Sequence, residues 1–349
     1  MKLLILTQAV DENNPILGFF LDWIKEFAKH CESVIVICLF KGKHNLPANV
    51  RVLSLGKEDG VSRIKYLIRF YKYIWQEKDN YEAVFVHMNQ IYVILGGLLW
   101  KLWRKKIGFW YAHGHVPFTL RIAEKIADNI FASTSSGFRI KSKKLNIVGQ
   151  GIDTEKFLPD TNKKPNDKFK IISIGRISPT KDYETLINAI ELIKKEVENI
   201  EVKIIGEPGT PEQKIYLENL KRIIQEKKLE KTIYLVGAVA NRNIISFLQE
   251  VDLFVNTSHT GSLDKAIVEA MACGLPILTC NEALEEVLGD NKVMLMFEKK
   301  NINQLAEKIK QSYLMDKEER KVVGNNLRLI VERGHALPNL IKKILVKYK

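Results

Sequence analysis

The sequence VNTSHTGSLDKAIVEAMACGLPILTC, from Val255 to Cys280, decides the fold of this chain. It contains an apolar strand that ends at Val255, a loop rich in Ser, Thr and Gly, and a short helix over about Asp264–Ala272. A Gly-Leu-Pro stop and a second apolar strand follow. This order is half of a nucleotide-binding α/β unit. The loop delivers backbone N–H groups to a helix N-terminus, where these donors and the helix dipole favour an anion.

Lys265 and Glu269 are four residues apart in this stretch, so they share one face of the predicted helix. A cation beside a diphosphate and a carboxylate beside a ribose diol would suit a sugar nucleotide. The alternative is a surface ion pair on an ordinary crossover helix.

Strand and helix patterns alternate along the rest of the chain, which predicts parallel sheets with helices on both faces. The predicted strands of the first half are Leu3–Leu6, Val34–Leu39, Val50–Leu53, Ala83–Val86, Ile107–Trp110, Asn129–Ala132 and Leu145–Val148. Those of the second half are Lys170–Ile174, Glu201–Ile205, Ile233–Val236, Asp252–Val255 and Pro276–Thr279. Predicted helices include Phe19–Ala28, Ile64–Trp75, Glu184–Val197, Pro211–Lys228 and Asn243–Gln249, and residues 302–349 are predicted to be helical with a break at Gly334–Pro338.

The polar stretch PDTNKKPNDK, Pro159 to Lys168, lacks any hydrophobic periodicity and is predicted to be a linker. A chain of 349 residues with 46% hydrophobic and 27% charged residues suits two globular domains. We therefore predict a first domain over residues 1–160 and a second over residues 165–334.

The net charge of +13 suits an anionic partner, which could be a nucleic acid, a nucleotide sugar or an anionic membrane face. No nucleic-acid motif accompanies the charge, so we expect no nucleic-acid partner. The four cysteines lack zinc-ligand spacing and lie in or beside apolar runs, which predicts reduced, buried thiols in a cytoplasmic protein. The N-terminal MKLLILTQAV is predicted to be a buried strand rather than a secretory signal, and no apolar run is long enough to span a membrane.

A second candidate constellation is SIGRISPTKDYETLINAI, Ser173 to Ile190. Gly175 after the strand permits a close backbone approach, and Thr180 or Asp182 is placed to cap the next helix. Arg176 offers a rigid fork to phosphate oxygens and Lys181 a mobile point charge. Because basic residues disfavour the positive end of a helix dipole, an anionic ligand explains this pair better than two solvated charges do.

Further candidates follow other predicted strands. Glycines end the strands in IIGEPG (Ile204 to Gly209) and LVGAV (Leu235 to Val239). His113 in FWYAHGHVP follows an apolar strand, with His115 as a competing candidate and His87 at the end of the preceding strand. The segment VGQGIDTEKF, residues 148–157, is interpreted mainly as a structural turn.

The segment EAMACGLP, Glu269 to Pro276, resembles the signature of glycosyltransferase family 4, whose members are retaining enzymes of the GT-B fold. The motif Gly-Arg-x-x-x-x-Lys at Gly175–Lys181 resembles the family's diphosphate motif, and residues 148–157 resemble its Asn-Gly-Val-Asp turn. The resemblance implies two Rossmann-like domains facing a central cleft, with the C-terminal helix, about residues 335–349, packed back on the first domain.

The resemblance also assigns roles to residues of this chain. It implies that Arg176, Lys181 and His113 are catalytic, the first two at the diphosphate and His113 at the transferred sugar. Glu269 is implied to bind the ribose, and Val239 to lie at the base. The residues implied to bind the donor are Gly18, Gly175, Arg176, Lys181, Gly206, Glu207, Val239, Asp264, Lys265, Ala266 and Glu269.

Two positions depart from the family pattern. The family commonly shows Glu-x7-Glu, but Gly261 stands where the first Glu would be, and Asp264 is a hypothetical substitute for it. The family's Gly-Gly pair near the N-terminus is here only Gly18. Donor-sugar recognition is therefore expected to differ from that of the family.

We predict a retaining glycosyltransferase that moves a sugar from a UDP- or GDP-sugar to a hydroxyl of a glycan or lipid-linked glycan, with no cofactor and no metal. Two alternatives stay open. One is a nucleotide-sugar epimerase of the same fold, and the other is a non-catalytic nucleotide-sugar-binding protein, which the missing first Glu would suit.

Two segments rich in basic and aromatic residues, Arg63–Trp75 and Gly96–Trp110, resemble an interfacial membrane face. The family resemblance also implies acceptors on lipid and membrane contact by the first domain. Peripheral contact with the inner face of an anionic cell membrane is one reading, and crossover helices with a basic outer face are the other.

Overall fold

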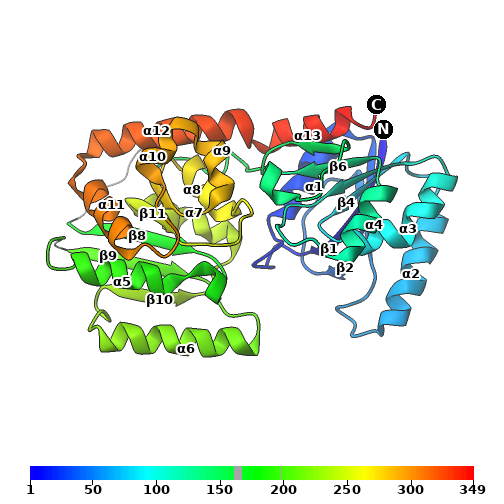
Figure 1. The fold of residues 1–349 in the computed structure, drawn as a ribbon. Coiled ribbons are helices and arrows are strands. Elements are labelled where there is room, and N and C mark those ends of the chain that lie inside the picture. The colour runs from blue at the N-terminus through cyan, green and yellow to red at the C-terminus, as the bar shows by residue number, and fades with distance from the viewer. Residues whose placement is uncertain (161–166, 198) are drawn as a thin grey trace. The chain divides into compact units, whose positions relative to one another are not determined.

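The computed structural model describes residues 1–160, 167–197 and 199–349, which form two α/β units (Figure 1). The first unit comprises Met1–Asp153 and His335–Lys349, and the second comprises Thr154–Gly334. The second unit thus begins before residue 160, because Arg328 donates hydrogen bonds to the carbonyl oxygens of Thr154 and Phe157. Part of the predicted linker, residues 161–166, lies outside the described residues.

Within its described residues, the first unit contains a seven-stranded parallel sheet in the order β3-β2-β1-β4-β5-β6-β7. These strands are near-continuous apolar runs, whose side chains point alternately to the two faces of the sheet and bury both of them. All seven strands were predicted from the sequence. Their bounds are β1 Lys2–Val10, β2 Ser33–Lys41, β3 Val50–Ser54, β4 Ala83–His87, β5 Lys106–Trp110, β6 Asn129–Ala132 and β7 Leu145–Ile147.

Helices cover both faces of this sheet. Along β1, Leu3 and Ile5 point into one core and Leu4 and Leu6 into the other, as the two-residue period of a strand requires. The first core is closed by α1 (Phe20–His30) and α13 (Leu337–Val346), and the second by α2 (Arg63–Gln76), α3 (Gln90–Leu102) and α4 (Phe118–Ile126). A 3₁₀ turn, η1, spans Ser135–Gly137.

The C-terminal segment His335–Lys349 belongs to the first unit. Its last aromatic residue, Tyr348, is buried and donates its hydroxyl to the carbonyl oxygen of Val84 in β4, 2.8 Å away. At the start of the segment, Ile152 donates to His335 O, and Leu337 donates to Ile152 O, both at 2.8 Å. Two chain segments far apart in sequence are therefore joined at one place in this unit.

His87, one of the candidate histidines, is a core residue. It is 2% exposed at the end of β4, and its ring stacks on Phe20 at 4.0 Å between centroids. Its Nδ1 lies 3.3 Å from Thr7 Oγ1, and burial lowers the pKa of His87 to about 3. A neutral imidazole enclosed by aromatic rings packs the core, so the active-site reading of His87 is wrong.

In the second unit, residues 154–160, 167–197 and 199–334 contain five parallel strands in the order β10-β9-β8-β11-β12. All five were predicted. Their bounds are β8 Phe169–Ile174, β9 Ile200–Ile205, β10 Ile233–Gly237, β11 Leu253–Asn256 and β12 Ile277–Thr279. The helices are α5 Tyr183–Ile193, α6 Pro211–Glu226, α7 Asn241–Glu250, α8 Lys265–Ala272, α9 Glu285–Leu288, α10 Lys292–Leu295, α11 Ile302–Leu314 and α12 Lys317–Gly334. The 3₁₀ turns are η2 Pro179–Lys181, η3 Glu282–Leu284 and η4 Gly289–Asn291.

The four cysteines are free and buried, as predicted, and burial raises the pKa of each thiol. In the part of the chain that the structure describes, no helix has the length and apolar character needed to cross a membrane.

Candidate functional site

Three glycines line the carboxyl ends of neighbouring strands in the second unit. Gly175 follows β8, Gly206 follows β9 and Gly237 ends β10. Gly175 donates its N–H to Ile205 O, and Gly206 donates to Gly237 O, both at 2.9 Å. A Cβ on Gly206 would lie 1.9 Å from the carbonyl oxygen of Gly175. The ends of β8 and β9 can approach this closely only because the second residue has no side chain.

Arg176 leaves this glycine edge with an exposed side chain. Among the residues that the structure describes, none forms a hydrogen bond or an ion pair with its guanidinium. Glu207, from the same edge, is also exposed and accepts a backbone hydrogen bond from Ile177 at its carbonyl oxygen. At this edge, the guanidinium of Arg176 thus has no partner among the described residues and follows the backbone of the glycines.

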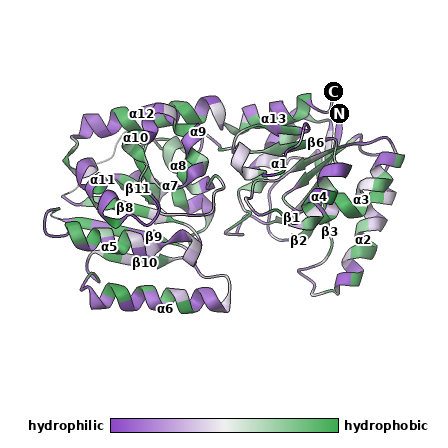
Figure 2. Ribbon diagram, in the orientation of Figure 1, coloured by the Kyte–Doolittle hydropathy of each residue, from purple (hydrophilic) through white to green (hydrophobic). Residues whose placement is uncertain are grey.

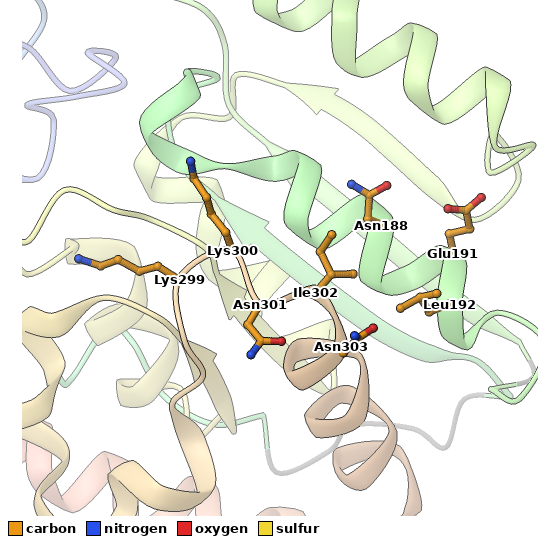
Figure 3. A pocket seen from close by; sticks show the side chains of 8 residues that line it. All are labelled: Asn188, Glu191, Leu192, Lys299, Lys300, Asn301, Ile302 and Asn303. Carbon is orange, nitrogen blue, oxygen red and sulfur yellow. The ribbon is translucent and has the colours of Figure 1, made fainter.

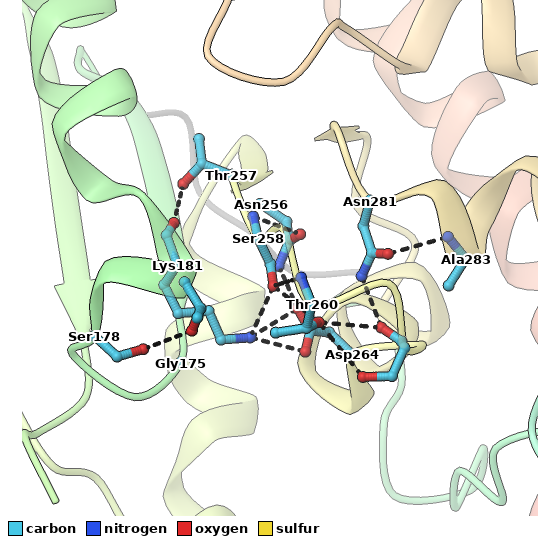
Figure 4. Close-up of polar contacts among 12 residues, drawn as sticks. Gly175, Ser178, Lys181, Asn256, Thr257, Ser258, Thr260, Asp264, Asn281 and Ala283 are labelled. Carbon is cyan, nitrogen blue, oxygen red and sulfur yellow. Dashed lines mark hydrogen bonds and ion pairs between the residues drawn. The ribbon is translucent and has the colours of Figure 1, made fainter. Parts of the chain in front are cut away.

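Lys181 lies at the centre of a polar cluster formed with the loop after β11 (Figure 4). Its Nζ lies 2.8 Å from both carboxylate oxygens of Asp264 and 3.3 Å from Ser258 Oγ. Asn256 donates to Asp264 Oδ2 at 2.9 Å. The side chains of Lys181 and Asp264 are only 13% and 17% exposed, so this ion pair is largely withdrawn from water. Sequence reasoning named both residues but did not predict that they pair.

The loop of residues 257–264 is built from buried polar side chains. Ser258 Oγ lies 3.1 Å from Thr260 Oγ1, and Asn281 donates to Ser262 O at 2.8 Å (Figure 4). Gly261, at the position of the family's first Glu, has a φ of +62°, in the left-handed region that favours glycine. A glutamate would be strained at this position, which gives a physical reason for its absence.

Lys265 and Glu269 form an ion pair with each other on α8. Glu269 is 3% exposed and also accepts a hydrogen bond from Asn241 Nδ2 at 3.2 Å, while the Lys265 ammonium lies over the Phe157 ring. Glu269 is therefore buried and Lys265 is partly exposed, so the pair lies at the edge of the core. Asn241, two residues after Val239, is a contact that the sequence analysis missed because its pattern indicated only a helix start.

Helix capping at this site differs from the prediction. Asp264 precedes α8, but its carboxylate turns to Lys181 and Asn256 instead of capping the helix where Lys265 and Ala266 begin it. Asp182 precedes α5, but its carboxylate accepts from Thr185 Oγ1, and Thr180 Oγ1 faces Ser178. The side chains expected to cap α5 therefore contact side chains of their own turn and helix start instead of backbone N–H groups.

The remaining candidates lie in the first unit. His113 is exposed; its backbone N–H donates to Gly137 O, and its Nδ1 accepts the N–H of His115. Desolvation, helped by His115 and Arg139, lowers the pKa of His113. Gly18 donates to Asn14 O within its own loop, where a Cβ would lie 2.7 Å from that oxygen. The glycine is thus required by the loop itself.

A hollow of about 710 Å³ lies elsewhere in the second unit, between α5 and the start of α11 (Figure 3). None of the predicted donor residues lines it, and its Lys299 is paired with Glu282. Its lining residues are Asn188, Glu191, Leu192, Lys299, Lys300, Asn301, Ile302 and Asn303. Among the described residues, no group of three or more His, Cys, Asp or Glu side chains is arranged to hold a metal ion.

Residues 154–329 match the family model described as glycosyl transferases group 1, and this range includes the whole polar cluster and the glycine edge. The chain is 29% identical over 252 residues to the capsular polysaccharide biosynthesis glycosyltransferase CapM of Staphylococcus aureus, covering 63% of this chain and 62% of CapM. It is 22% identical over 243 residues to a GDP-mannose-dependent alpha-(1-6)-phosphatidylinositol monomannoside mannosyltransferase of Mycobacterium tuberculosis, covering 61% of each. The chain thus spans less than two thirds of these relatives.

Solved structures share the fold over nearly the whole chain. Anabaena HepE in complex with UDP aligns with a TM-score of 0.79 at 17% identity, covering 99% of each chain. TarM aligns with a TM-score of 0.78 at 12% identity, covering 100% of this chain and 99% of TarM. These likenesses confirm the predicted GT-B fold with two Rossmann-like domains. The family match spans half of the sequence and includes both the Gly175–Lys181 motif and the Glu269–Pro276 segment, so the chain belongs to the glycosyl transferase group 1 family.

Proposed function

We propose that this protein is a retaining glycosyltransferase that transfers a sugar from a nucleoside-diphosphate sugar to a hydroxyl acceptor without a metal ion. The observation that carries the proposal is the guanidinium of Arg176, which follows the glycine edge between β8 and β9 and has no hydrogen-bond or ion-pair partner among the described residues. Lys181 lies five residues further along the chain. Two cations at the carboxyl end of a parallel sheet suit a diphosphate.

Each side chain has a distinct task in this proposal. Arg176 and Lys181 stabilise the charge that develops on the leaving diphosphate, where one such contact is worth roughly 3 kcal/mol. Lys181 exchanges part of its contact with Asp264 for phosphate oxygens. Glu269 accepts hydrogen bonds from the ribose hydroxyls in place of Lys265, and the backbone near Val239 meets the base. In the other unit, His113 contacts the transferred sugar.

The Asp264 carboxylate accepts hydrogen bonds from Lys181 and Asn256, so it is held as an acceptor and is a poor nucleophile. The acceptor hydroxyl instead attacks the anomeric carbon on the side from which the diphosphate leaves, which retains the configuration. The bond between the anomeric carbon and the phosphate oxygen breaks, and the hydroxyl proton passes to the leaving diphosphate. With Arg176 and Lys181 supplying positive charge, no metal ion is needed to neutralise the diphosphate.

The donor is a UDP- or GDP-sugar and the acceptor a glycan or a lipid-linked glycan. HepE was solved with UDP, and the mycobacterial relative is named for GDP-mannose and a phosphatidylinositol acceptor. CapM is named for capsular polysaccharide biosynthesis. These names support both bases and both acceptor classes for this chain.

The test is a thermal-shift screen of the protein against UDP, GDP and their common sugar conjugates, with and without EDTA. A ligand at 100 times its Kd stabilises the native state by about 2.7 kcal/mol, so one nucleotide should raise the melting temperature selectively. The shift should persist in EDTA. Absence of any shift with every nucleotide would contradict the donor site. Conversion of the donor to its epimer without acceptor would instead identify an epimerase, and binding without transfer to any acceptor would identify a binding protein.

We also propose that α2 and α3 contact an anionic membrane surface. The exposed apolar side chains of α2 recur at helical spacing on one face of the helix, and exposed basic residues flank them in the sequence. Figure 2 shows that hydrophobic and hydrophilic residues both occur along α2. Tyr71 of α2 donates to Leu95 O of α3, which places the two helices side by side. The exposed apolar residues are Ile64, Leu67, Ile68, Tyr71 and Trp75 on α2, with Ile91, Leu98 and Leu102 on α3.

Co-sedimentation with vesicles of phosphatidylglycerol or phosphatidylcholine tests this surface. We expect binding to the anionic vesicles only. Because one basic residue near an anionic surface is worth about 1 kcal/mol, Lys72→Ala should weaken binding about fivefold. Ile68→Ser should also weaken it, whereas Ile215→Ser, on an apolar residue of α6 that is 73% exposed against 61% for Ile68, should not. Equal binding to both vesicle types, or an equal loss in the Ile215 variant, would remove the proposed surface.

A further inference from the structure

The turn that carries Lys181 contains a residue in an unusual backbone conformation. Asp182 has φ 47° and ψ 51°, in the left-handed region, and is only 9% exposed. For a residue with a Cβ, such a conformation costs on the order of 1–3 kcal/mol and persists only where the surroundings fix it. Something must therefore hold this turn in place.

The loop after β11 supplies the contacts that hold the turn. Thr257 Oγ1 donates to the carbonyl oxygen of Lys181 at 2.6 Å (Figure 4). His259 contacts the residues on either side of Lys181: its backbone N–H donates to Thr180 O at 2.9 Å, and its Nε2 lies 3.0 Å from Asp182 Oδ2. The loop thus contacts three consecutive residues of the turn, Thr180, Lys181 and Asp182.

We propose that His259 is a positioning residue that fixes the direction from which the Lys181 side chain reaches its anionic partners. The imidazole Nε2 lies 3.0 Å from Asp182 Oδ2, a polar contact without hydrogen-bond geometry, and the same oxygen accepts from Thr185 Oγ1 at 2.7 Å. The backbone N–H of His259 holds the preceding peptide at the same time. With both ends of the turn fixed, Lys181 points at Asp264 and Ser258. The consequence for the donor diphosphate rests on the proposed function.

Lysine labelling with acetic anhydride, followed by peptide mass spectrometry, tests the positioning role without any nucleotide. In His259→Ala, the loosened turn should raise the labelling rate of Lys181 about fivefold, the ratio that corresponds to the loss of one typical polar contact. Lys265 is a matched control, because it is also ion-paired and 18% exposed in the same unit. His259→Gln, whose amide can donate to Asp182, should restore the wild-type rate. An unchanged rate at Lys181, or an equal rise at Lys265, would overturn the proposal.

The affinity of the His259 variants for UDP or GDP then tests whether the positioning of Lys181 affects diphosphate binding. His259→Ala should weaken binding of the nucleotide that binds the wild type about fivefold, and His259→Gln should restore it. If His259 acts through Lys181, the loss should vanish in a Lys181→Met background. An equal loss in both backgrounds would show that His259 touches the ligand itself, which would overturn a positioning role. If the wild type binds neither nucleotide, the proposed function fails, while the labelling result still decides the role of His259.

Discussion

Replacing Arg176 with Ala should lower the transfer rate at least about tenfold and leave the melting temperature unchanged. A charge-assisted contact to phosphate is worth about 1.5–3 kcal/mol, which sets the size of the loss. The stability should not change, because among the described residues the guanidinium has no partner to lose. Steady-state rates with the cognate donor and a thermal melt of the free protein measure the two effects.

Replacing Lys181 with Met should lower both the activity and the stability. The same phosphate contact is lost, and Asp264 is left with Asn256 as its remaining hydrogen-bond donor. A partly buried carboxylate that loses its ion-pair partner costs about 1–3 kcal/mol. A Lys181→Met/Asp264→Asn double variant should therefore recover most of the stability, because the unpaired charge is gone, but none of the activity.

A matched lysine outside the polar cluster serves as a control. It distinguishes the loss of a diphosphate contact from a general effect of removing a positive charge on activity. Lys203 is partly buried, lies on β9 and pairs with Glu201 and Glu250, far in sequence from the polar cluster. Lys203→Met should keep the wild-type rate. Wild-type activity in the Arg176 or the Lys181 variant, or an equal loss in the Lys203 variant, would contradict the assignment of the diphosphate site.

The sequence predicts the strands of this protein well, because a buried parallel strand is a short apolar run that needs little tertiary information. All twelve strands in the described residues correspond to predicted runs. The helix α4 was not predicted, since it is only nine residues long and follows an irregular loop. The helix predicted at Glu184–Val197 ends earlier, at Ile193.

Several residues of the site were predicted from the sequence, but the contacts between their side chains were not. Motif spacing indicates which residues lie at the strand ends, so Arg176, Lys181 and Glu269 could be named in advance. Motif spacing does not indicate which charged side chains of two different loops form an ion pair. The pairing of Lys181 with Asp264, 83 residues apart, could therefore come only from the structure. His259 was missed for the same reason, because its partners belong to a turn far from it in sequence.

Replacing Gly206 with Ala should strongly destabilise the second unit. The new Cβ would lie 1.9 Å from the carbonyl oxygen of Gly175 and 3.6 Å from Arg176 N, and the φ of Gly206 is +152°. Backbone atoms cannot move aside as a flexible side chain can. We expect the free energy of unfolding to fall by at least about 3 kcal/mol, or roughly 10 °C in melting temperature.

Gly334→Ala is the control for this effect, because Gly334 ends α12 and a Cβ there would meet no atom within 4 Å. Its melting temperature should stay near that of the wild type. An unchanged melting temperature in Gly206→Ala would contradict the close approach of the ends of β8 and β9. Below its melting temperature, the Gly206 variant should also bind the nucleotide more weakly than the Gly334 variant does. The ends of β8 and β9 must move apart to admit the methyl group, and Arg176 begins the segment that moves. The absence of a side chain at Gly206 therefore determines both the stability of this edge and the position of the Arg176 guanidinium.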